Sequence, residues 1–166
     1  AICGQGPMPR AASVDALADL GLSSVPGSGL LPACVPGAVG GWLRLLAEFG
    51  TMRLADVLEP AIGYAENGFP LLPESARAID VLAPLFREEW HGSAQIYLTG
   101  GTPPAAGSRF RNPALANTYR RLVKAAESAS TDREAQIQAA HDAFYNGFVA
   151  EEIAKFLASG PMLDAT

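Results

Sequence analysis

The sequence predicts a mainly α-helical fold, an irregular array of about six short helices, two of them kinked by proline, with long loops and little or no sheet. Over most of the chain, apolar residues recur at intervals of three and four, which is the spacing of one helix face. Gly and Pro are dense over the first forty residues and again over 91–112, where they predict turns and loop.

The composition narrows the class of protein. The chain has 166 residues, 49% of them apolar and 17% charged, with a formal net charge of −5. This length suits one ordinary domain, and so many apolar side chains exclude a disordered chain. An acidic balance argues against nucleic-acid binding, which uses a basic excess. No apolar run reaches the roughly 18 residues that a membrane span requires. We therefore expect neither a nucleic acid nor a membrane as partner.

The first segment, residues 1–37, is predicted to be a Gly/Pro-rich loop with one short helix. Ala1–Cys3 has the character of a strand end. Ser13 is a typical N-cap for a helix over Val14–Leu20, which a glycine then stops. Residues 38–166 are predicted to form a separate helical domain.

Six apolar stripes of helical period follow in residues 38–166. They run from Val39 to Leu46, Leu54 to Ala65, Ala76 to Trp90, Leu115 to Ala126, Ile137 to Phe144 and Val149 to Leu157. Within the stripes we expect Trp42 to be a core residue and the apolar residues of the last stripe to face inward. Pro60 and Pro84 lie inside two stripes and are expected to kink or split those helices.

Several sequence signals set the ends of these helices. Asn112-Pro113 predicts a helix start with Asn as the cap, and Thr131 with Glu134 forms a candidate capping box. Asn146-Gly147 and Gly160 predict helix stops. Residues 91–112 are predicted to be loop, with Ile96-Tyr97-Leu98 as one extended segment.

The histidines, the paired glutamates and the basic cluster of this chain each have a structural interpretation. His141 lies on an apolar stripe without an evident nucleophile, and His91 is expected at a helix C-terminus, where a cation suits the helix dipole. Glu88-Glu89 are adjacent and do not face each other on a helix, so we expect a solvated face. A basic cluster over residues 109–124 either balances the acidic total or meets a phosphate or an acidic neighbour.

No metal, cofactor or disulfide framework is expected. Cys3 and Cys34 are too few for such a framework, and we expect both to be reduced and buried. Neither histidine lies near a cysteine in sequence, so zinc has little support. Gly27-Ser28-Gly29 is not a phosphate-binding loop, because no Lys-Ser or Lys-Thr follows it.

Three phrases, however, follow one another along the chain in a recognisable order. The first, Gly4–Ala12, reads GQGPMPRAA and comes just after the expected strand end. The second extends over Val35–Pro70 and contains VPG, GW, FG, PAI and GFP in turn. The third, Ala143–Ala154, reads AFYNGFVAEEIA. Together they resemble the gamma-glutamyltransferase (gamma-glutamyltranspeptidase) family over most of the chain.

The resemblance implies an N-terminal-nucleophile hydrolase with an αββα core, made as one precursor that cuts itself into a large and a small subunit. The new N-terminal Thr of the small subunit attacks a gamma-glutamyl amide, with its own α-amine as base. The chain would then be an internal helical part of the large subunit, partnered by the rest of that subunit and by the small subunit. Thr166 is not this nucleophile, so we expect no catalytic residue in the chain and no activity from it alone.

One residue departs from the family pattern. Aligning the first phrase on its Gly and on Pro9 places Gln5 where the family has an Arg that holds the substrate's α-carboxylate. A neutral Gln lacks the bidentate charged pair of Arg with a carboxylate, so the resemblance implies a related amide as substrate, such as a cephalosporin-like side-chain acyl group or a poly-gamma-glutamate. Arg10 could replace the missing charge only if the loop bends to bring it round.

A second hypothesis stays open at this point, namely a non-catalytic helical interaction module. Both ends of the chain suggest a piece of a larger protein, and an isolated piece would expose apolar surface and self-associate. The sequence does not specify the compartment.

Overall fold

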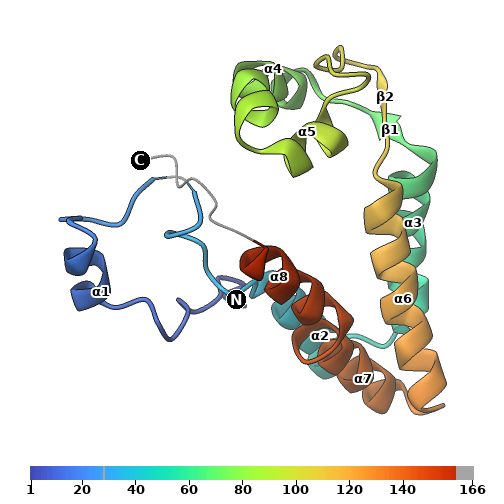
Figure 1. Cartoon of the computed structure of the whole chain (residues 1–166). Helices are drawn as coiled ribbons and strands as arrows, with labels where there is room; N and C mark the ends of the chain where they lie inside the picture. The colour runs from blue at the N-terminus through green and yellow to red at the C-terminus, as the bar shows by residue number, and fades with distance from the viewer. Residues whose placement is uncertain (28, 160–166) are drawn as a thin grey trace. The chain divides into compact units, whose positions relative to one another are not determined.

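The computed structural model describes residues 1–27 and 29–159, which are mostly helical (Figure 1). The elements in chain order are α1 (Val14–Asp19), α2 (Ala38–Phe49), α3 (Leu54–Asn67), β1 (Phe69–Pro70), α4 (Pro73–Glu88), α5 (His91–Tyr97), β2 (Arg109–Phe110), α6 (Pro113–Ala129), α7 (Arg133–Tyr145) and α8 (Phe148–Ala158). The mainly helical class predicted from the sequence is confirmed. The sheet in the described residues is one short antiparallel pair, with Phe69 opposite Phe110 and Pro70 opposite Arg109.

The helix starts follow the capping signals with one exception. Ser13 caps α1 by accepting the Ala16 N–H at 3.1 Å. Asn112 caps α6 by accepting the Leu115 N–H at 3.0 Å. The capping box predicted at Thr131 and Glu134 is wrong by one residue, because the Asp132 carboxylate caps α7 by accepting the Ala135 N–H at 2.9 Å.

Three further expectations are corrected by the structure. Ala1–Cys3 is not a strand in this structure. Pro60 and Pro84 lie inside α3 and α4, and both helices continue through them, so of the predicted kink or split the split is wrong and the kink stays a prediction. The region 91–112 is not all loop, because α5 occupies His91–Tyr97 and so includes Ile96 and Tyr97, which were predicted to be extended. The predicted stop at Gly160 and the residue Thr166 lie outside the described residues.

The chain forms two compact units: residues 1–52 with those from 125 onward make unit 1, and residues 53–124 make unit 2. The division predicted at residue 37 stays a prediction. Unit 2 is organised around the packing of α4 on α5. One cluster of its buried side chains consists of Leu71, Ala76, Ile79, Ala83, Phe86 and Leu98.

A chain of aromatic rings links the elements of unit 2. Tyr97 of α5 stacks on Phe86 of α4 at 5.7 Å and on Phe110 of β2 at 5.9 Å between ring centroids. Phe110 in turn meets Phe69 of β1 edge-to-face at 5.9 Å. Such pairs add about 0.5–1.5 kcal/mol each beyond area burial. Tertiary stacking therefore stabilises α5, whose own sequence has little helical signal.

Unit 1 is built on α2 and α7, which pack as an antiparallel pair. The start of α2 contacts the end of α7, and the end of α2 contacts the start of α7. Leu43 of α2 and Ile137 and Ala140 of α7 are the buried apolar residues of these two helices. The loop with the first of the three phrases, Gly4–Ala12, packs next to the start of α2 in this pair.

Two expectations about the unit 1 core are wrong. Trp42 is 60% exposed, and Phe156 and Leu157 of α8 are each more than half exposed. The reason is geometric: α2 uses one face, with Leu43, against α7, whereas Trp42 lies on another face, which none of the described helices of unit 1 covers. The helical period was correct, but it could not tell which partner each face has.

Candidate functional site

The first phrase packs directly on the turn that opens the second. The Val35 N–H donates to the Pro7 carbonyl at 2.9 Å, which lays the two stretches side by side. A Cβ on Gly37 would lie 2.6 Å from the Gly6 nitrogen and 2.8 Å from the Gln5 carbonyl carbon. A Cβ on Gly6 would lie 1.5 Å from the Val35 carbonyl oxygen. Only glycine therefore permits this approach of the two backbones.

The third phrase reaches the same place through Tyr145, near the end of α7. The Tyr145 hydroxyl donates to the Pro36 carbonyl at 2.6 Å and accepts the Gly40 N–H at 3.0 Å. Gly37, the N-cap of α2, has no side chain to accept that N–H, which is one of the unpaired donors of a helix start. Tyr145 thus supplies, from 105 residues away, the acceptor that a Ser or Asp cap would supply locally.

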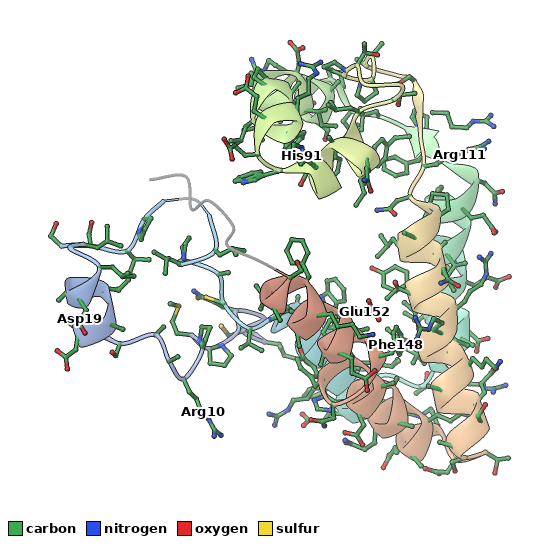
Figure 2. All side chains as sticks on the ribbon, in the orientation of Figure 1. Arg10, Asp19, His91, Arg111, Phe148 and Glu152 are labelled. Carbon is green, nitrogen blue, oxygen red and sulfur yellow. The ribbon has the colours of Figure 1, made fainter. Side chains whose placement is uncertain are left out.

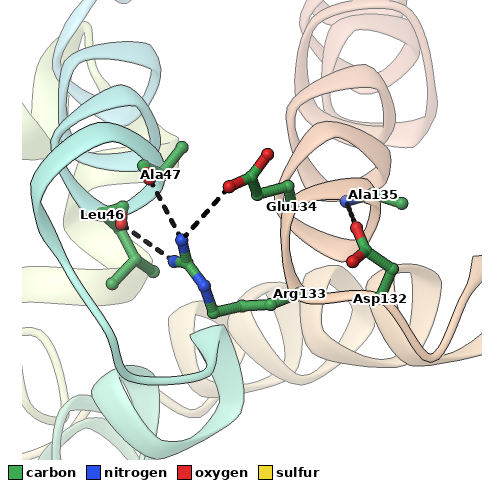
Figure 3. A network of polar contacts seen from close by, with 6 residues as sticks. All are labelled: Leu46, Ala47, Asp132, Arg133, Glu134 and Ala135. Atoms are coloured by element: carbon green, nitrogen blue, oxygen red, sulfur yellow. Dashed lines mark hydrogen bonds and ion pairs between the residues drawn. The ribbon is translucent and has the colours of Figure 1, made fainter.

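The other end of α2 is held by Arg133 at the start of α7 (Figure 3). Its Nη1 and Nη2 donate to the carbonyls of Leu46 and Ala47 at 3.0 and 3.1 Å. A cation near the last carbonyls of a helix also interacts favourably with the helix dipole. The side chain is only 25% exposed, and its contact with Glu134 is longer, at 3.7 Å. Contacts with α7 therefore hold both ends of α2, and with them the turn at residues 35–37 on which the first phrase packs.

Gln5, the candidate substrate-binding residue, lies at this junction. Its side chain is exposed, while its carbonyl carbon lies over Gly37. Arg10, five residues on, is also exposed, and its guanidinium extends away from the ribbon (Figure 2). Arg10 follows the first residue of a turn closed by the Ala12 N–H to the Pro9 carbonyl at 2.9 Å. The bend that would bring Arg10 round in place of the family Arg is not seen.

The sequence did not single out Tyr145 or Arg133 as residues with a role. The signal for Tyr145 was its place in the third phrase together with a cluster of glycines at the start of α2, which lacks an ordinary cap. The signal for Arg133 was weaker. A basic residue at a helix N-terminus is disfavoured by the dipole of its own helix, which indicates that its charge interacts with another helix.

The remaining candidates lie elsewhere and have structural surroundings. The His141 ring is 4.7 Å from that of Tyr145, and its Nδ1 is 3.4 Å from an Asp142 oxygen. His91 is the first residue of α5, so the expected place at a helix C-terminus is wrong. In the basic cluster, Arg120 pairs with Glu66, and Arg111 Nε donates to the Asn67 carbonyl at 3.2 Å.

The cysteines and potential metal ligands add no site. Cys3 and Cys34 are free but exposed, so the expectation that they are buried is wrong. The Cys34 thiol lies 3.6 Å from the sulfur of Met8, within the loop segment of the first phrase. Among the described residues, no three His, Cys, Asp or Glu side chains are grouped so that they could hold a metal ion. Within the same residues, no helix has both the length and the apolar character needed to cross a membrane.

Comparison with known proteins tests the resemblance carried by the three phrases. Residues 1–164 match the family described as Gamma-glutamyltranspeptidase. The chain belongs to the gamma-glutamyltranspeptidase family. The resemblance read from the three phrases is therefore confirmed, and in this member of the family they come together at the start of α2.

Individual relatives agree with this assignment. The chain is 33% identical over 138 residues to the glutathione hydrolase-like YwrD proenzyme of Bacillus subtilis, covering 82% of this chain and 23% of that protein. The solved structure of LmbA2991HD matches 99% of the chain, and 28% of its own, with a TM-score of 0.92 and 44% identity. The cephalosporin acylase of Bacillus halodurans matches 98% of the chain and 29% of its own, with a TM-score of 0.78 and 27% identity. The chain thus spans about a quarter of the length of these relatives.

Proposed function

We propose that the chain is part of the large subunit of an N-terminal-nucleophile amidohydrolase or acyltransferase that cleaves gamma-glutamyl or related amides. The observation that carries this proposal is the family match over residues 1–164. The names of its relatives support it, since they include a glutathione hydrolase-like proenzyme and a cephalosporin acylase. Membership of this family also favours an enzyme over a non-catalytic helical interaction module.

In this proposal the reacting groups lie elsewhere in the protein. The nucleophile is the N-terminal Thr of the small subunit, activated by its own α-amine, and it forms an acyl-enzyme that passes to water or to an acceptor amine. The chain supplies no catalytic residue. Its part is to present the Gln5 segment to the substrate.

The role proposed for Gln5 is contact with the substrate at the position of the family's carboxylate-binding Arg. The exposed side chain on a backbone packed against Gly37 supports this role, because the backbone of the segment has a close neighbour while the side-chain amide lies at the surface. A hydrogen bond to a charged group contributes about 1.5–3 kcal/mol, against about 1 kcal/mol for a neutral one. A Gln in this place therefore holds a carboxylate less tightly than an Arg would, which favours a related amide over glutathione itself.

The test uses the full-length processed enzyme and two chromogenic anilides. Gamma-glutamyl p-nitroanilide carries an α-carboxylate, whereas 4-aminobutyryl p-nitroanilide is the same molecule without it. Gln5→Arg should lower KM for the first probe about fivefold, the equivalent of about 1 kcal/mol, and leave the second unchanged. An unchanged KM for gamma-glutamyl p-nitroanilide would show that Gln5 does not lie at the carboxylate.

The partners proposed for the chain are the rest of its own large subunit and the small subunit. An apolar groove of about 540 Å³ runs between the N-terminal residues and α2, and Ile2, Trp42 and Phe49 are among the residues that line it. Trp42 and Phe49 are 60% and 72% exposed. So much apolar area in one place is typical of a surface that another part of a protein covers. We infer that the remainder of the enzyme covers this groove and that the chain on its own self-associates through it.

A further inference from the structure

We propose that Tyr145 is a positioning residue for the substrate, acting through the Gln5 segment. This inference rests on the proposed function of Gln5, and it adds a residue that makes no contact with the substrate itself. Tyr145 belongs to α7, 140 positions along the sequence from Gln5. The structure connects the two through the turn at residues 35–40.

The connection has two contacts, and each is short. The first joins Tyr145 to the turn: its hydroxyl donates to the Pro36 carbonyl at 2.6 Å and accepts the Gly40 N–H at 3.0 Å, so one oxygen bridges both sides of Gly37. The second joins the turn to the segment, since the position of a Gly37 Cβ is within 2.8 Å of the Gln5 carbonyl carbon. The turn and the Gln5 segment cannot move closer together, because their backbones are already as close as glycine allows.

The hydroxyl oxygen of Tyr145 makes both hydrogen bonds to the turn. Gly37 caps α2 without a side chain, so α2 depends on Tyr145 for the acceptor at its first turn. Without that oxygen the Gly40 N–H and the Pro36 carbonyl lose their partner, and the turn gains freedom to shift. Any shift of the turn moves Gln5, because the backbone of Gln5 packs directly on it. A small misplacement of a substrate-contacting group lowers its contribution strongly.

The direct measurement is hydrogen–deuterium exchange of the full-length processed protein with Tyr145→Phe. Peptides that cover residues 35–41 should exchange about fivefold faster, because the Val35 N–H donates to the Pro7 carbonyl of the first phrase and the Gly40 N–H donates to the Tyr145 hydroxyl, while peptides of α4 stay unchanged. Tyr64→Phe is the matched control, because Tyr64 is 63% exposed on α3. Unchanged protection over residues 35–41 in Tyr145→Phe would overturn the proposal. Should that variant fail to fold, Gly40→Ala replaces it, since its Cβ would press on the Tyr145 hydroxyl at 2.9 Å.

A kinetic cycle then separates positioning from general stability. Tyr145→Phe should raise KM for gamma-glutamyl p-nitroanilide about fivefold with kcat unchanged, and leave KM for 4-aminobutyryl p-nitroanilide unchanged. In the Gln5→Ala background the same substitution should add nothing, because the residue it positions is gone. Additive effects, or equal effects on the two anilides, would overturn the proposal. A rise of KM in Gln5→Ala without one in Tyr145→Phe also overturns it, whereas no effect of Gln5→Ala on either anilide overturns the proposed function of Gln5 itself.

Discussion

Replacing Arg133 by methionine removes the guanidinium that holds the last carbonyls of α2 while keeping most of the side-chain volume. Two hydrogen bonds are lost, to Leu46 at 3.0 Å and to Ala47 at 3.1 Å. A hydrogen bond from a charged donor contributes about 1.5–3 kcal/mol, and a cation at a helix C-terminus about 0.3–1 kcal/mol. The Leu46 carbonyl keeps a partner, because it also accepts the Gly50 N–H at 3.0 Å. We therefore expect a loss of about 2 kcal/mol from the free energy of opening of α2 in Arg133→Met.

Hydrogen–deuterium exchange of the full-length protein measures that free energy locally. A loss of about 2 kcal/mol corresponds to roughly 30-fold faster exchange of the α2 amides. The matched control is Arg44→Met on the same helix, whose i,i+4 pair with Glu48 at 2.8 Å is largely exposed. Such pairs contribute about 0.3–0.5 kcal/mol, so exchange should rise less than about threefold. Equal exchange of α2 in the two variants would refute the reasoning that Arg133 fixes this helix end.

Three other positions in the chain give direct predictions. Gly68 has a φ of +89°, and a Cβ there would lie 2.5 Å from Arg109 Cγ, so Gly68→Ala should lower the free energy of unfolding by more than about 1 kcal/mol. Gly63 lies inside α3 with open space around it, so Gly63→Ala should raise the free energy of unfolding by up to about 1 kcal/mol. A melting temperature of Gly68→Ala that is not below that of the unsubstituted protein, or one of Gly63→Ala that is not above it, would contradict the corresponding prediction. Trp42→Ser should reduce the self-association of the 166-residue chain in light scattering, and an unchanged mass distribution would show that the groove beside α2 is not the contact surface.

Local sequence signals were enough for most of the helices. The 3.6-residue period located α2, α3 and α6, and Asn112-Pro113 gave the start of α6. The period could not locate α5, because the stability of that helix comes from Tyr97 stacking on rings of α4 and β2. Nor could it predict that α4 continues through Pro84, since the packing of α4 on α5 outweighs the one backbone donor that the proline removes.

The candidate site was predictable in its residue types and not in its geometry. The three phrases indicated the family, and the first of them suggested Gln5 as the residue that contacts the substrate, which stays a prediction. No local pattern could show that Tyr145 accepts the Gly40 N–H, because that contact joins residues 105 apart in the chain. The exposure of Trp42 was also beyond reach, since a helical period identifies an apolar face without identifying what covers it.

Intact mass spectrometry of the purified full-length gene product tests the central claim most directly. If the chain is part of a self-processing amidohydrolase, the precursor is recovered as two polypeptides, the larger containing this sequence and the smaller beginning with Thr. A single uncut polypeptide that retains amidase activity would contradict the account, because the α-amine of the reactive Thr would then not exist.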